Sequence, residues 1–207
     1  MPNNNTHVFA FPICNAVYSG ENLDYCIAND VHFVTLSHPM LQKHVEDKKD
    51  EKRSKQVYVS VTSKSDSKDA QKIAFEKCSF AVDIFKICSN IYYNPYIRAW
   101  LFDIDNDNIK KYRQVVVSWE KSDFENTMAI EFSQRQFKTE LNEDILSSVH
   151  KRHFEDFESL YKDFFGDTPT PLVKVLGKVI HMLASIFTEP NQHERVVRLC
   201  SILDTLV

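Results

Sequence analysis

Four consecutive polar residues offer the densest group of candidate ligands in the sequence. His150, Lys151, Arg152 and His153 lie within one turn of a predicted helix and could present imidazole and guanidinium groups to a metal ion or a phosphate. The sequence places no third ligand beside the two histidines, so a solvated helix face is the interpretation we favour. His150, His153 and Arg152 remain candidate phosphate or metal contacts.

A second pattern with chemical meaning is the alternation of Asp103, Asp105 and Asp107. This D-x-D-x-D spacing is typical of a calcium loop, but the sixth position is Asn108 instead of Gly and the twelfth is Gln114 instead of Glu. We therefore favour a polar hairpin tip, since Asp and Asn are common in turns. No cofactor and no metal ion is expected.

Other binding and catalytic motifs are weak or missing. The basic residues between positions 48 and 55 alternate with acidic ones, and the formal net charge of the chain is −4. This balance argues against a protein that grips nucleic acid over its whole surface. The sequence has no G-x-S-x-G, and its three glycines, Gly20, Gly166 and Gly177, stand too far apart to build a phosphate loop.

The bulk composition predicts a folded protein of the cytoplasm. Hydrophobic residues make up 43% of the 207 positions, which is enough for a core. No apolar run approaches the roughly 18 residues that span a bilayer, and the first residues do not resemble a secretory signal, so no membrane association is expected. Five cysteines without a C-x-x-C pair predict reduced, mostly buried thiols.

Alternating and helical patterns predict the elements. Apolar β-type runs predict strands over 8–18, 30–36 and 55–62, the last with Val57, Val59 and Val61 on one face. Ser67 is expected to cap a helix that runs to about Asn90 and buries a stripe that includes Ile73. Three further strands are predicted over 96–103, 113–119 and 127–132.

The pattern changes after Glu140. Asn142 makes a good helix start, and Gly166 follows the expected helix end. Two more helices are predicted over 172–187 and 189–207, the second with Pro190 at an early position. The expected fold class is α+β, with a β-rich N-terminal domain over 1–140 that carries one long amphipathic helix. An incomplete C-terminal helical bundle over 141–207 would follow it.

The segment PNQHERVVRLCSILDTLV, from Pro190 to Val207, resembles an early helix of HEPN domains of the ApeA-like kind. Arg195 matches the arginine that opens an apolar helix in that family. Asp204 stands in the acidic run, where Glu is more usual. The segment VYVSVTSKSDSKDAQKIAFEKCSFAVDIFKI resembles the strand, polar turn and helix upstream of such domains, so the resemblance covers most of the chain loosely.

This resemblance implies a helical bundle that often dimerises and, in catalytic members, cleaves RNA without a metal. The catalytic signature of the family is an Arg followed after four to six residues by His, and no arginine of this chain has it. We expect the signature to belong to helices beyond Val207. Arg195 and Asp204 are the candidate contributors to a composite site. They lie about 13–14 Å apart along one helix, so they cannot pair directly.

Two functional hypotheses follow. The first is the N-terminal sensing or regulatory region of a HEPN-type antiviral-defence or toxin-like RNase, non-catalytic in this form and with RNA as a partner. The alternative is a protein-interaction module that forms a homodimer or binds a partner protein through its C-terminal helices, because an unfinished bundle exposes an apolar stripe. The sequence shows no convergent group of titratable residues that would support a small-molecule enzyme.

Overall fold

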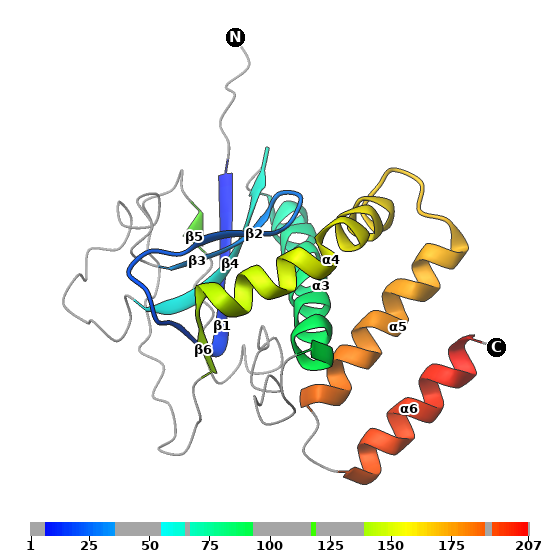
Figure 1. Ribbon diagram of the computed structural model, residues 1–207. Coiled ribbons are helices and arrows are strands. Elements are labelled where there is room, and N and C mark those ends of the chain that lie inside the picture. The colour runs from blue at the N-terminus through cyan, green and yellow to red at the C-terminus, as the bar shows by residue number, and fades with distance from the viewer. Residues whose placement is uncertain are drawn as a thin grey trace.

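A computed structural model describes residues 7–35, 55–64, 67–92, 117–118, 139–188 and 192–206. The helices pack in successive layers outward from a sheet (Figure 1). The long helix α3 (Lys68–Tyr92) lies against the sheet, α4 (Glu143–Phe164) crosses beside it, α5 (Pro171–Thr188) lies on α3, and α6 (Gln192–Leu206) lies outermost on α5. The expected α+β fold class is confirmed.

The sheet is mixed, and its long first strand pairs with three of the other strands. Its strands are β1 (His7–Tyr18), β2 (Asp24–Ala28), β3 (Val31–Thr35), β4 (Gln56–Ser63), β5 (Val117–Ser118) and β6 (Thr139–Leu141). They are ordered β2-β3-β4-β1-β5, all antiparallel along this path, while β6 pairs with β1 in parallel. The predicted strands over 8–18, 30–36 and 55–62 correspond to β1, β3 and β4.

The alternation predicted for β4 is confirmed by its burial. Val57, Val59 and Val61 are all buried in the core. In the register of β1 and β4, Val61 lies opposite Phe9 and Val59 opposite Phe11. Such cross-strand pairs of aromatic and β-branched residues stabilise antiparallel sheets.

Strand β2 is not among the predicted strands, and the hairpin it forms with β3 connects the sheet to two helices. The turn between them contains Asn29 with φ 44°, a left-handed conformation that Asn adopts more readily than most residues. The next residue, Asp30, accepts hydrogen bonds from Lys77 of α3 and from the hydroxyl of Tyr161 of α4, both at 3.2 Å. The turn thus fixes both helices against the sheet.

Helix α3 begins as predicted. The N–H of Ala70 donates to Ser67 Oγ at 3.1 Å, which satisfies one amide of the first turn. Every residue from 80 to 89 is buried, so this half of the helix is covered on all sides. The placement of Ile73 in the buried stripe is wrong, because Ile73 lies on the exposed side of α3 with Lys72 and Glu76, whereas Ala74 of the same turn is buried.

Helix α4 begins at the predicted cap and joins the same core as the strands. The N–H of Ile145 donates to Asn142 Oδ1 at 2.9 Å. Leu141, Leu146 and Tyr161 belong to the hydrophobic core that the sheet and α3 form. The predicted division after residue 140 falls inside β6, so the two predicted parts share one core.

Helices α5 and α6 run antiparallel as a hairpin (Figure 1). The prediction of a helix over 172–187 is confirmed by α5. The described part of the last helix starts at Gln192, and Pro190 lies outside the described residues. The strands predicted over 96–103 and 127–132 also lie outside the described residues. Of the strand predicted over 113–119, only residues 117–118 are described.

Gly177 is required where α5 crosses α4. A Cβ at this position would overlap the ring of Phe164, and that ring is held by its stack on Phe80, with centroids 4.5 Å apart and planes 4° apart. We expect Gly177→Ala to lower the free energy of unfolding by about 1–3 kcal/mol, because the ring must leave its stack. Lys178→Ala, on an exposed neighbour, should change it by less than about 0.5 kcal/mol. Urea denaturation measures both, and equal stability of the two variants would contradict this packing.

Candidate functional site

The predicted ligand group on α4 is only partly described. His150 is exposed, and its ring lies edge-on to that of Tyr25 of β2, with centroids 6.0 Å apart. Arg152 and His153 belong to α4, but their side chains lie outside the described residues. Within the described residues no group of three or more His, Cys, Asp or Glu side chains could hold a metal ion. Asp103, Asp105 and Asp107 lie outside this range.

The two residues predicted from the HEPN resemblance lie elsewhere. Arg195 is half-buried in the first turn of α6, and Asp204 is exposed near its end. Helix α6 lies on the far side of α5 from the sheet, whereas His150 lies in the first half of α4 next to β2 (Figure 1). The structure therefore does not bring His150 together with Arg195 and Asp204.

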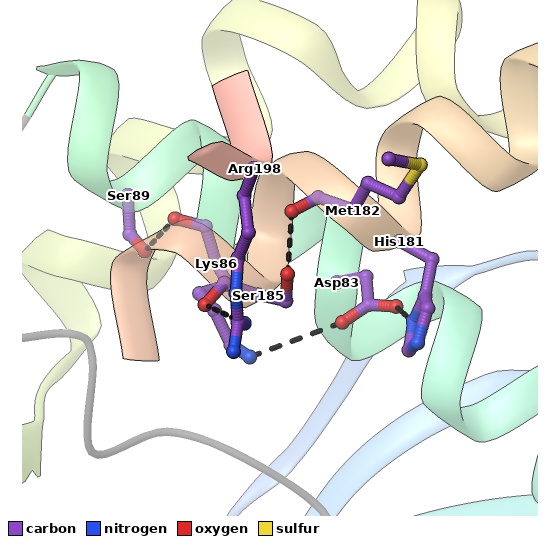
Figure 2. Close-up of polar contacts among 7 residues, drawn as sticks. All are labelled: Asp83, Lys86, Ser89, His181, Met182, Ser185 and Arg198. Atoms are coloured by element: carbon purple, nitrogen blue, oxygen red, sulfur yellow. Dashed lines mark hydrogen bonds and ion pairs between the residues drawn. The ribbon is translucent and has the colours of Figure 1, made fainter. Parts of the chain in front are cut away.

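A polar cluster that sequence reasoning missed lies between α3, α5 and α6 (Figure 2). Asp83 and Lys86, one turn apart on α3, are only 4% and 1% exposed. Lys86 Nζ lies 3.8 Å from Asp83 Oδ1. Charged side chains are rarely buried this completely unless they are paired. The signal for this pair was their i, i+3 spacing inside the apolar run FAVDIFKIC.

Helix α5 contributes a histidine to this cluster. His181 Nδ1 lies 2.8 Å from Asp83 Oδ2, although the His181 side chain is 70% exposed. The contact is a hydrogen bond in which the imidazole donates from Nδ1, and it is strengthened when the ring is protonated. The buried Asp83 of α3 therefore binds α5 through its hydrogen bond with His181.

Helix α6 is attached to α5 beside the same cluster. Arg198 Nη1 donates to the carbonyl of Ser185 at 3.1 Å, and the Ser185 hydroxyl donates to the carbonyl of Met182 at 2.6 Å (Figure 2). On α3, the hydroxyl of Ser89 donates to the carbonyl of Lys86 at 3.1 Å. Polar contacts thus run from α3 through α5 to α6.

The cluster has one feature of a catalytic site, because a carboxylate that orients a histidine is a common way to build a general base. However, the hydroxyls of Ser89 and Ser185 donate to the carbonyls three residues earlier in their own helices, as serines within helices often do. The second oxygen of Asp83 faces Lys86. This arrangement fits a connection between three helices better than a reacting centre.

The outer side of α6 is apolar. Val196, Leu199, Leu203 and Leu206 are each between 45% and 63% exposed, and we call these four residues the α6 stripe. The buried residue of this helix in the described range is Ile202, which faces inward. Single exposed leucines are ordinary on protein surfaces, whereas four exposed aliphatic residues in a row on one helix are less common.

Comparison of the chain with protein-family models, with curated proteins and with solved structures gave no match. Among the described residues, no helix has the length and hydropathy needed to cross a membrane.

The buried pair on α3 predicts an unequal response to single and double substitution. Asp83→Leu leaves the ammonium of Lys86 without its buried carboxylate and should lower the free energy of unfolding by about 3–5 kcal/mol. The double variant Asp83→Leu/Lys86→Met removes both charges and should be more stable than Asp83→Leu alone. Chemical denaturation of both variants measures this. A double variant that is less stable than Asp83→Leu would show that the two charges do not compensate each other.

The cysteines should differ in reactivity. Burial raises the pKa of Cys88 to about 12 and that of Cys78 well above its usual value, whereas Cys200 is exposed on α6. Because the thiolate is the nucleophile, iodoacetamide at pH 8 should alkylate Cys200 in the native protein and the other two only after unfolding. Mass spectrometry of the peptides would report this, and labelling of native Cys88 as fast as Cys200 would contradict the described core.

Proposed function

We propose that this chain is a protein-interaction module whose C-terminal helical hairpin binds an apolar helix of a partner. The single observation that carries this proposal is the exposed α6 stripe, because it combines four aliphatic side chains without a charged residue among them. Leaving such a row in water is unfavourable by roughly 25 cal/mol for each Å² of apolar surface. A partner that covers it gains that free energy.

The spacing of the stripe indicates what kind of partner fits. Val196, Leu199, Leu203 and Leu206 follow one another at intervals of three, four and three residues. This is the spacing at which side chains of one helix insert between those of a neighbouring helix. A helix with an apolar face is therefore the occupant that the stripe fits.

Helix α5 adds apolar surface at its start. Leu172 is 67% exposed, whereas Leu176, Val179 and Leu183, which follow on the same face of α5, are half-buried.

The contact area of the α6 stripe determines how strong an association we expect. A helix of 15 residues is about 22 Å long, so a contact strip about 10 Å wide covers roughly 220 Å² of α6. Stable interfaces bury about 800 Å² on each partner. The α6 stripe therefore supports a weak, reversible association.

Substitution of the stripe tests this function. Leu199→Glu/Leu203→Glu should abolish concentration-dependent association in sedimentation velocity and lower the fluorescence of a hydrophobic dye, because it puts two charges into the contact surface. The matched control is Val197→Glu/Ser201→Glu, which adds the same charges at the same spacing on another exposed side of α6. The control should keep both properties of the unaltered chain.

Two results together would refute the proposal. One is sedimentation of the unaltered chain as a monomer at every concentration, and the other is dye fluorescence no higher than that of Leu199→Glu/Leu203→Glu. Circular dichroism of each variant shows whether α6 remains helical, so a folding defect is recognised separately.

A second candidate is the sensing or regulatory region of a HEPN-type antiviral-defence or toxin-like RNase, non-catalytic in this form. Its support is the resemblance of 190–207, together with the presence of a helix at Gln192–Leu206 that carries Arg195 in its first turn. Arg195 and Asp204 are the proposed contributors to a composite site with RNA. Free thiols at Cys78 and Cys88 in the core support a cytoplasmic location for either candidate.

The RNase relationship predicts a lack of cleavage. Labelled single-stranded RNA incubated with this chain should remain intact, because none of its arginines is followed after four to six residues by a histidine. Gel electrophoresis measures this, and a heat-denatured sample serves as the control. Cleavage that disappears on denaturation would contradict a non-catalytic region.

A further inference from the structure

We infer that the partner helix is α6 of a second copy of this chain, paired antiparallel about a two-fold axis that crosses the α6 stripe at the level of position 201 along the helix. This inference rests on the proposed function and names its partner. It follows from the order of residues along the α6 stripe, from the charges at its two ends and from the position of the stripe relative to α5.

The stripe is symmetric along the helix. The intervals of three, four and three residues are the same in both directions, and their midpoint is Ser201. In an antiparallel pair, Leu199 then packs on Leu203 of the second copy, and Val196 on Leu206. A two-fold interface requires that one patch be complementary to itself, and this spacing meets that requirement.

The charges on α6 favour the antiparallel direction. Arg198 is held against α5, so the charged residues of α6 that remain are Glu194 and Arg195 near its start and Asp204 near its end. Antiparallel pairing brings Arg195 of one copy beside the end of α6 that carries Asp204 in the other. The helix dipoles act in the same sense, because the positive N-terminus of one helix lies beside the negative C-terminus of the other.

The position of the stripe suits a bundle of four helices. Ile202 is buried and Arg198 contacts α5, so these residues mark the side of α6 that faces α5. The centre of the stripe lies about a quarter turn around the helix from that side. In a four-helix bundle each helix contacts two neighbours at about this angle, so α5 and α6 of two copies complete one bundle.

Cys200 provides a direct probe of this arrangement. It lies one residue from the midpoint, is exposed, and flanks the stripe. In the antiparallel pair the two Cys200 residues are offset by only about 3 Å along the axis, on helices about 8–10 Å apart. A short bismaleimide that spans this gap should join two chains through Cys200.

The experiment compares three proteins treated with this reagent under native conditions. The unaltered chain should give a covalent dimer, and Cys200→Ser should give none. The third variant, His193→Cys/Cys200→Ser, places the thiol one heptad earlier on the same side of α6. Antiparallel pairing separates those two thiols by about 24 Å, so the reagent should not join them.

The outcomes separate this inference from the function on which it rests. A covalent dimer for both the unaltered chain and His193→Cys/Cys200→Ser would show parallel pairing and overturn the inference. No covalent dimer for the unaltered chain, with dye binding still lost in Leu199→Glu/Leu203→Glu, would also overturn it but leave the α6 stripe as the binding surface of another helix. Circular dichroism and the sedimentation coefficient of each cysteine variant confirm that it folds.

Discussion

The structure depends on the complete burial of the second half of α3. Every residue from 80 to 89 is buried, so the sheet alone cannot cover this helix, and other elements must lie on its remaining sides. The elements that do so in the described part of the chain are α4 and α5 (Figure 1). The order of layers from the sheet outward follows from this one requirement.

The same burial explains the polar contacts between the helices. Asp83 and Lys86 lie in the covered part of α3, where an unpaired charge would be strongly destabilising. Asp83 contacts both Lys86 and His181 of α5, and Arg198 of α6 contacts the carbonyl of Ser185 a turn further along α5. Helix α5 is thus fixed on one side by the core, whereas α6 packs on α5 and keeps its own stripe exposed.

Much of this fold was predictable because local signals and burial agree. The alternation of β4, the Ser67 cap of α3 and the Asn142 cap of α4 all lie where the sequence places them. Strand β2 was missed because its short sequence, DYCIA, alternates poorly, and its pairing with β3 depends on the turn at Asn29.

The candidate site was less predictable because it depends on contacts between distant residues. The pairing of Asp83 with His181 joins positions 98 apart in the sequence, which no local pattern encodes. Conversely, His150 looked like a ligand in the sequence, but its ring lies against Tyr25, and Arg195 and Asp204 lie on a different helix. An exposed apolar stripe on the last helices was predicted from the sequence, and Val196, Leu199, Leu203 and Leu206 are exposed on α6.

The α6 stripe is proposed to be the contact surface between two copies of this chain. Hydrogen–deuterium exchange of the α6 amides, measured over a range of protein concentrations, tests it most directly. If the claim is right, exchange in α6 slows as the concentration rises, while exchange in the buried half of α3 stays constant. Exchange in α6 that is the same at all concentrations would contradict the self-association of this helix.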